Sequence, residues 1–247
     1  MDADPTEPPS AVDEESPFEN IYNFRDVGET VNKHSSGRIM REKMMYRSGR
    51  LDDATSEDCR KLIQEYGIKT VIDLRTKSEH IKQSQRLTSA GHFVTAAKAN
   101  ADTNPLAVPG VRTVRVNFIS RKFELALLRR LGWWDLMLAF FQHPSPRGGK
   151  DRTGLLCILT LFLLGVPIDS ITHDYISSWA GLAPIRKQML VEIEEIGLDE
   201  RYAMTPETLV QDVHEFLKKR WGGAEGYLES LGVGEDVRGR LVTNLRA

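Results

Sequence analysis

Cysteine is scarce in this sequence, and long apolar runs and an excess of one charge are missing. The 247 residues include two cysteines, Cys59 and Cys157, which excludes a disulfide scaffold and favours a reducing compartment. The longest apolar run, 155–164, is too short to span a bilayer, and no apolar leader follows the acidic start. A formal net charge of −2 gives no general attraction for nucleic acid or membranes. We expect a cytoplasmic protein with no nucleic-acid partner and no stable membrane insertion.

The sequence also lacks histidines at metal-ligand spacing, and its first 17 residues lack basic side chains. The six histidines are scattered without metal-ligand spacing, so we expect neither a metal nor another cofactor. Residues 1–17 contain no Lys or Arg and are rich in Pro, Asp, Glu and Ser. Such a segment cannot bury enough apolar surface to fold. We therefore predict a disordered acidic tail at 1–17 and one folded domain at 18–247.

A polar, glycine-rich hexapeptide is the most informative stretch. Residues 149–154 read Gly-Lys-Asp-Arg-Thr-Gly and stand directly before the apolar run 155–164. The backbone N–H groups at a helix start are unpaired, and the helix dipole favours negative charge there. Arg152 adds a planar guanidinium that can hold a phosphate with two parallel hydrogen bonds. The alternative is a plain helix start with solvated Lys150 and Arg152, because glycine-rich loops alone are weak signals.

The hexapeptide also resembles the closing half of a known phosphate loop. Cysteine-dependent tyrosine phosphatases of the atypical subgroup, which includes dual-specificity and phosphoinositide-directed enzymes, carry His-Cys-x-x-Gly-Lys-Asp-Arg-Thr-Gly. The segments 23–28 (Asn-Phe-Arg-Asp-Val-Gly), 46–49 (Tyr-Arg-Ser-Gly) and 71–75 (Val-Ile-Asp-Leu-Arg) resemble further signatures of this subgroup. The resemblance implies an α/β fold of the tyrosine-phosphatase type, in which a central, mainly parallel sheet is flanked by helices. The phosphate loop would lie at a strand-to-helix turn.

The resemblance also implies a chemistry. The family hydrolyses phosphomonoesters through a phosphocysteine and without a metal, so the partners would be phosphoproteins or phosphoinositides. Arg152 would clamp the phosphoryl oxygens, Thr153 would hydrogen-bond the thiolate, and Lys150 would attract acidic substrates. The implied catalytic residues are Arg152, Asp151 and Asp73, with one of the two aspartates as the general acid. The implied phosphate-binding residues are Arg147, Gly148, Gly149, Lys150, Asp151, Arg152, Thr153 and Gly154.

The nucleophile of this pattern is missing. It should lie six residues before Arg152, where this chain has Pro146. Proline has no nucleophilic side chain and no N–H to donate. Cys157 lies inside the apolar helix and reads as a small buried hydrophobe, while Cys59 belongs to a separate early helix. We therefore expect no cysteine-dependent turnover from this chain.

The segment before the hexapeptide departs from the family as well. A buried central strand should lead into the phosphate loop, but residues 142–148 hold two prolines within three residues, which excludes such a strand. A helix, the central strand and the His-Cys pair look absent near 142–148. A skipped exon, an error in the gene model, a natural splice form or a degenerate paralogue would each produce this pattern.

Three outcomes stay open at this point. The chain is an incomplete version of a working phosphatase, a catalytically dead phosphate-binding module, or an unstable product without function. Each of two pairs of charged residues also has two possible interpretations. Arg25 and Arg47 are either partners in ion pairs or face the phosphate. Asp73 and Arg75, at the end of a predicted buried strand at 68–74, either lie near the phosphate or lock a turn.

Local signals predict further elements of the fold. Thr55 or Ser56 has the side chain to cap a helix. The alternating segment 111–118 is typical of a strand. Thr205, followed by proline, predicts the start of a late helix.

Overall fold

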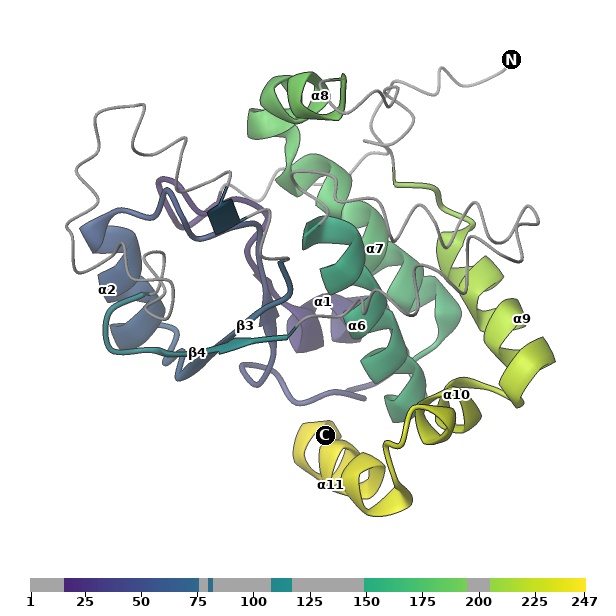
Figure 1. Cartoon of the computed structure of the whole chain (residues 1–247). Helices are drawn as coiled ribbons and strands as arrows, with labels where there is room; N and C mark the ends of the chain where they lie inside the picture. The colour runs from purple at the N-terminus through teal and green to yellow at the C-terminus, as the bar shows by residue number, and fades with distance from the viewer. Residues whose placement is uncertain (1–15, 76–79, 82–107, 117–148, 195–204) are drawn as a thin grey trace.

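The structure is a computed structural model that describes residues 16–75, 80–81, 108–116, 149–194 and 205–247. Figure 1 shows the arrangement of its helices and strands. The strands are β1 (Arg25–Asp26), β2 (Tyr46–Arg47), β3 (Thr70–Asp73) and β4 (Arg112–Arg115). The helices are α1 (Val27–Lys33), α2 (Ser56–Gln64), α6 (Gly149–Leu164), α7 (Ile168–Gly181), η2 (Ala183–Ile185), α8 (Arg186–Glu194), α9 (Leu209–Trp221), α10 (Ala224–Ser230) and α11 (Glu235–Leu245).

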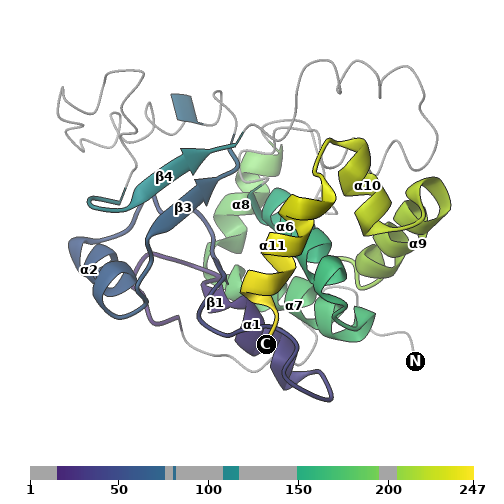
Figure 2. The same ribbon diagram turned by 90° about the horizontal axis from the view of Figure 1, so that it is seen from below.

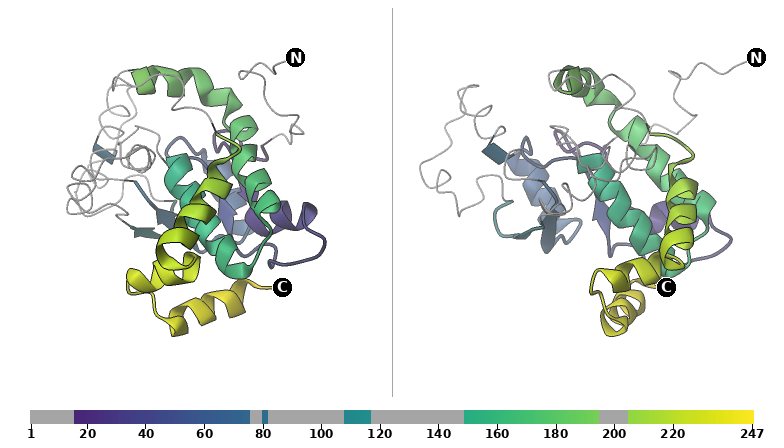
Figure 3. Two further views of the ribbon diagram at one scale, coloured as in Figure 1. Left: turned by 90° about the vertical axis from the view of Figure 1, so that its right-hand side faces the viewer. Right: turned by 45° about the vertical axis from the view of Figure 1, so that its right-hand side comes forward.

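Helix α6 stands between two different surroundings. The sheet formed by β3 and β4, with α2 beside it, lies on one side, and α7 and α9 lie on the other (Figures 1 and 2). Helices α10 and α11 contact α6 as well, and α1 packs against α7. Figure 3 shows α6 among the neighbouring helices in two further views. An apolar helix with this many neighbours can form the centre of a core.

The largest apolar core is built around α6. Leu161 and Leu164 are fully buried and Ile158 is nearly so. They pack in one cluster with residues of α1, α7, α9 and α11, which are Val27, Val31, Ile171, Tyr175, Leu209, Val210, Val213, Leu217 and Leu245. The apolar run predicted to be a helix is therefore one. It ends at Leu164, and Gly165 follows with φ +73, a left-handed conformation that favours glycine.

The strands form two small sheets. β1 pairs with β2 in antiparallel fashion, and β3 pairs with β4 in parallel fashion with Asp73 opposite Arg115. The structure thus mixes helices and strands, as the predicted α/β class requires, and its longer strand pair is parallel. The wider central sheet stays a prediction. Residues 117–148, where the missing strand was inferred, lie outside the described residues.

Helix α2 begins where its sequence predicted. Thr55 is the N-cap: its side chain accepts a hydrogen bond from the Asp58 N–H, and the Asp58 carboxylate accepts one from the Thr55 N–H. This reciprocal pair satisfies two donors that a helix start leaves open. The same carboxylate also accepts from the backbone N–H groups of Glu19 and Asn20, which joins the N-terminal segment to α2.

Two local predictions were wrong. The late helix α9 begins at Leu209 with Thr208 as its N-cap, rather than at Thr205. β3 is a strand, as predicted for 68–74, but it is not buried throughout: Ile72 is 54% exposed. Successive strand residues point to opposite faces. Val71 packs against the cluster beside α2, so Ile72 lies on the other face. A fully buried strand needs a layer on both faces.

The domain boundary predicted at residue 17 is not tested, because the description starts at Ser16. Among the described helices, none is both long and apolar enough to cross a membrane.

Candidate functional site at the start of helix α6

The hexapeptide lies inside the first turns of α6. The helix already begins at Gly149, so residues 149–154 are helical rather than a loop in front of the helix. The first four N–H groups of a helix have no partner within it. Residues 149–152 are the first described residues of α6, and all four belong to the predicted phosphate-binding set. Pro146, Arg147 and Gly148 lie outside the described residues, as do the side chains of Lys150 and Asp151.

Arg152 joins α6 to the end of β3. Its side chain is buried, with 5% of its surface exposed, and its Nη1 donates a hydrogen bond of 2.7 Å to the Leu74 carbonyl oxygen. The carboxyl end of β3 therefore meets the first turn of α6. This is the edge of an α/β sheet at which ligand-binding residues gather. Leu74 stands between Asp73 and Arg75 in the chain, so this bond brings the segment that holds them close to the first turns of α6.

Asp73 is held by Arg75. The Arg75 Nε and Nη2 donate to the two carboxylate oxygens over 3.0 and 2.8 Å, and the Arg75 N–H donates to Oδ1. Burial acts to raise the pKa of Asp73, but Arg75 outweighs it and leaves that pKa below its ordinary value. Asp73 is thus an ionised partner in an ion pair that closes a turn. A general acid needs a proton near the working pH, so the catalytic role of Asp73 stays a prediction that this geometry does not favour.

Sequence reasoning missed two neighbours of this ion pair. Asp52 accepts a hydrogen bond of 2.5 Å from Arg75 Nη1. The His80 Nε2 lies 3.3 Å from the Asp73 carboxylate. Burial, aided by the positive charge of Arg75, lowers the pKa of His80, so this ring is neutral at neutral pH. Neither residue belongs to a motif, and only the folded chain brings them to the end of β3.

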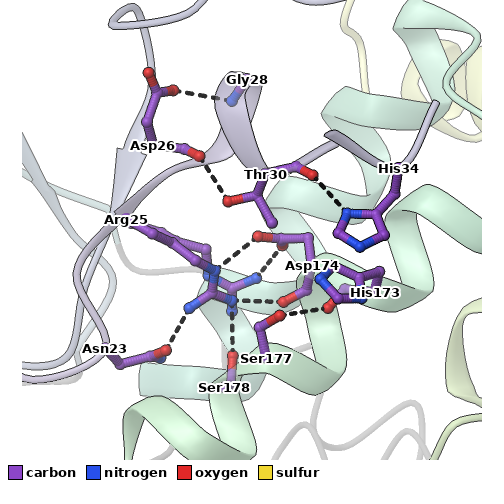
Figure 4. A network of polar contacts seen from close by, with 11 residues as sticks. Asn23, Arg25, Asp26, Gly28, Thr30, His34, His173, Asp174, Ser177 and Ser178 are labelled. Carbon is purple, nitrogen blue, oxygen red and sulfur yellow. Dashed lines mark hydrogen bonds and ion pairs between the residues drawn. The ribbon is translucent and has the colours of Figure 1, made fainter. Parts of the chain in front are cut away.

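Arg25 and Arg47 share a buried carboxylate. Figure 4 shows Arg25 beside Asp174 of α7, with Asn23 and Ser178 as further partners. The Arg25 Nε donates to Asp174 Oδ1 over 2.8 Å, and the Arg47 Nη1 donates to Oδ2 over 2.5 Å. Burial acts to raise the pKa of Asp174, but the two guanidinium groups hold it below its ordinary value. Of the two interpretations, the ion-pair interpretation describes both arginines.

Gly154 lets α6 and α7 approach closely. A Cβ on this residue would lie 3.1 Å from Cε2 of the Tyr175 ring, tighter than ordinary van der Waals contact. The same Cβ would lie 3.7 Å from the Arg47 Nη2. The last glycine of the hexapeptide therefore has a packing role in addition to any role toward an anion.

Neither cysteine is placed to act as the family's nucleophile. Cys157 lies five residues after Arg152 within α6, is 1% exposed, and burial raises the pKa of its thiol to about 11. A thiol with that pKa is protonated at neutral pH. Cys59 is half-buried within α2. Cys157 is thus buried within the apolar helix and Cys59 belongs to an earlier helix, as the sequence predicted.

Among the described residues, no group of three or more His, Cys, Asp or Glu side chains could hold a metal ion. The predicted independence from metals and cofactors stays a prediction.

Comparison with known proteins agrees with the sequence motifs. The tyrosine phosphatase family is matched over residues 16–247. A Cupriavidus necator protein whose name assigns it to the tyrosine-protein phosphatases is 26% identical over 230 residues, covering 85% of this chain and 81% of its own. A tyrosine-protein phosphatase of Nostoc commune is 27% identical over 230 residues, covering 80% of this chain and 71% of its own. A family match that spans nearly all of the sequence includes both the N-terminal motifs and helix α6, and the chain belongs to the tyrosine phosphatase family.

Proposed function

We propose that this chain binds phosphate monoesters at the start of α6 but does not hydrolyse them through a phosphocysteine. Tyrosine phosphatases are phosphoric monoester hydrolases, so the family supplies the ligand class. The proposed loss of turnover rests on the absence of a cysteine at the position of the nucleophile. The pattern places its nucleophile at Pro146, and Cys157, the cysteine nearest in sequence, is buried with a raised thiol pKa.

Binding would rest on the helix start and on Arg152. The backbone N–H groups of residues 149–152 would provide donors for the phosphoryl oxygens, and the helix dipole favours a dianion there. The bond between Arg152 and Leu74 positions the guanidinium at this end of the helix. By family resemblance, Arg147 and Gly148 extend the binding loop, and Thr153 follows it. Lys150 adds positive charge for acidic substrates such as phosphoinositides or the phosphorylated residues of a protein.

The catalytic step is where this chain differs. In the family, a thiolate forms a bond to phosphorus while the ester bond breaks, and a general acid protonates the leaving oxygen. Water then cleaves the thiophosphate bond. Without the thiolate, the general acid proposed at Asp151 or Asp73 has no departing group to protonate. The site then acts as a binding module, a pseudophosphatase with tyrosine, serine or inositol phosphates as its candidate ligands.

Calorimetric titration tests the binding. Phosphotyrosine peptide, phosphoserine peptide and a soluble inositol phosphate are titrated into the purified protein, into Arg152→Ala and into Arg240→Ala. Arg240 is the matched control, because it is an exposed arginine on α11 paired with Asp236. We expect binding to at least one ligand that Arg152→Ala loses and Arg240→Ala keeps. Equal binding by all three proteins, or no binding to any ligand, would contradict the proposal.

Hydrolysis of a generic aryl phosphate tests the missing turnover. We expect a rate no higher than that of Arg152→Ala and no sensitivity to vanadate. Vanadate-sensitive hydrolysis well above this control would show a working phosphatase.

A complete phosphatase is the second candidate, favoured by the names of both relatives and the near-complete family match. It would carry the missing strand and the His-Cys pair between Phe141 and Gly149. Transcript sequencing across these codons separates the two candidates. An uninterrupted transcript that encodes Pro146 supports the binding module, whereas an additional in-frame segment ending in His-Cys supports the phosphatase.

A further inference from the structure

A cavity of about 770 Å³ lies between two strand segments and helix α6. One wall consists of residues 43–52, which include β2, and another consists of residues 67–75, which include β3. Every residue of both segments lines the cavity. Successive side chains of a strand point to opposite faces of its sheet. An unbroken run of lining residues through β3 therefore places the cavity along the edge of this strand rather than over one face.

The hydrogen bonds of β3 show which of its edges is open. The carbonyl oxygens of Lys69 and Asp73 accept hydrogen bonds from backbone N–H groups in and directly after β4. Because these groups alternate between the two edges along a strand, the backbone groups of Ile72 and Leu74 point to the opposite edge. Arg152 of α6 donates to the Leu74 carbonyl oxygen from that edge. The open edge of β3 therefore faces α6 and the cavity.

β2, on the other wall, also has an open edge. Its first edge is occupied by β1, where the N–H of Val27 donates to the carbonyl oxygen of Met45. By the same alternation, the backbone groups of Tyr46 point away from β1. The described part of the chain pairs no third strand with β2 or with β3. The cavity thus adjoins two strands that each have an unpaired row of donors and acceptors.

Helix α6 gives the cavity an apolar side. Leu156 and Cys157 line it from the helix, and the 54% exposed Ile72 lines it from β3. An apolar small molecule would leave the open backbone groups without partners, and a small polar one would leave the apolar surface uncovered. An extended peptide satisfies both, because it has an N–H and a C=O along its edges and side chains on its faces.

We propose that the cavity binds an extended segment of another protein, with apolar residues at alternate positions, as an additional strand beside β3. Main-chain hydrogen bonds to the open edge provide affinity, and apolar side chains against α6 provide selectivity. A strand that already belongs to a folded sheet has a neighbour about 4.8 Å away, and residues 43–52 occupy that side of the cavity. The bound segment is therefore one without a fold of its own, which excludes the β3 edge of a second folded copy.

The proposal goes beyond the proposed function, because strand pairing requires no phosphate. The cavity does reach the predicted phosphate site, since Thr153 and Asp73 line it as well. Leu74, whose carbonyl oxygen is bonded to Arg152, stands at the end of the open edge. One end of the bound segment therefore lies beside the start of α6.

The experiment uses a fluorescein-labelled peptide of seven alternating threonine and valine residues, with a lysine at each end for solubility. The matched control has the same sequence with N-methyl groups on the valine amides, which removes the donors of one edge and adds bulk there. A strand between β2 and β3 has a wall along each edge, so methylation should interfere in either orientation. We expect one peptide per protein by fluorescence anisotropy, and at least about tenfold weaker binding of the methylated peptide.

Two variants at one position locate the pairing. Ile72→Pro removes an N–H from the open edge of β3 but no hydrogen bond to β4, and proline is tolerated in strands on such an edge. It should weaken peptide binding at least about tenfold. Ile72→Val keeps the N–H and the branched side chain, and it should bind within about twofold of the unaltered protein. In the unaltered protein, bound peptide should slow hydrogen exchange of the Ile72 amide at least about tenfold.

Several results would overturn the proposal. They are equal binding of the methylated peptide, unchanged binding in Ile72→Pro, an equal loss in Ile72→Val, an unchanged exchange rate at Ile72, and absence of peptide binding. Circular dichroism establishes that both variants are folded. If Ile72→Pro unfolds, the methylated peptide and the exchange rate decide on the unaltered protein. The peptide carries no phosphate, so its failure to bind would leave the proposed function untouched.

Discussion

The two sides of α6 are packed in different ways. On the side of α1, α7 and α9, branched apolar side chains are almost wholly buried, as Val31, Ile171 and Val210 show at 0% exposed. On the side of β3 and α2, Ile72 is 54% and Ile63 39% exposed. We call the first group the helical side and the second the sheet side. The sheet side has buried apolar residues as well, but they form a separate and smaller cluster than the one around α6.

The two sides of α6 therefore differ in how closely other elements cover the helix. Its run 155–164 is apolar around nearly the whole helix, and a helix of that kind is normally covered on all sides. The helical side supplies cover with α7 and α9, whereas a cavity adjoins the residues that face β3. A two-stranded sheet gains little stability alone, so the sheet side depends on α2 and on its contact with α6.

Removing the charge of Asp174 should cause the largest loss of stability. Asp174→Asn leaves Arg25 and Arg47 buried without their counter-ion, and breaking a buried ion pair in this way costs about 3–5 kcal/mol. Urea unfolding measures the free energy of unfolding. Asp236→Asn is the control, because its exposed ion pair with Arg240 should cost less than about 1 kcal/mol. Similar losses in both variants would show that the buried cluster is not stabilising.

Truncating one apolar side chain on each side of α6 sharpens the comparison. Leu161→Ala should cost about 2–5 kcal/mol, because Leu161 is fully buried among the residues of the helical side. Ile72→Ala on the sheet side should cost about 0.5 kcal/mol or less, because an exposed residue has little to lose. Urea unfolding of the two variants gives the difference. An Ile72→Ala loss as large as that of Leu161→Ala would mean that β3 is covered in solution.

Adding one methyl group at Gly154 tests the contact between α6 and α7. The new Cβ would lie 3.1 Å from the Tyr175 ring, and overpacking of a dense core costs about 1–3 kcal/mol. Gly239→Ala is the control, since a Cβ there meets nothing within 4 Å on the exposed helix α11. Thermal unfolding followed by circular dichroism compares the two. The account fails at this point if Gly154→Ala melts at or above the temperature of the unaltered protein.

Lowering the pH should reduce the free energy of unfolding through the buried carboxylate of Asp174. The effect at any single pH should be smaller than that of removing the charge. The pKa of Asp174 is lower in the folded state than its ordinary value near 3.9. Its contribution is therefore fully present above that ordinary value and is lost as the pH falls through the folded-state pKa. Unfolding free energies measured from neutral pH down to about pH 3 should fall less steeply in Asp174→Asn. Parallel pH profiles for the two proteins would contradict this assignment.

Several parts of the molecule could be predicted from local sequence. The apolar run 155–164 specified α6, Thr55 specified the start of α2, and the alternation after residue 111 specified β4, because each signal acts over a few neighbouring residues. The start of α6 was misplaced, since Gly149 and Gly154 suggested a loop. A glycine inside a helix costs only about 1 kcal/mol, which the packing of the helix can outweigh.

The parts that could not be predicted depend on residues far apart in the chain. Asp174 follows Arg25 by 149 positions and Arg47 by 127, so their shared ion pair leaves no local pattern. The exposure of Ile72 reflects what lies beside β3, which residues 68–74 alone do not reveal. The phosphate-binding set inferred from the hexapeptide stays a prediction, whereas the cavity lined by Arg47 depends on the folded chain.

A crystal structure with bound tungstate tests the central claim most directly, since tungstate mimics a phosphoryl group. The account predicts the oxyanion at the start of α6, within hydrogen-bonding distance of the amides of residues 149–152 and of the Arg152 guanidinium, with no cysteine sulfur beneath it. An empty helix start in a crystal saturated with tungstate, or a sulfur in contact with the ion, would contradict it.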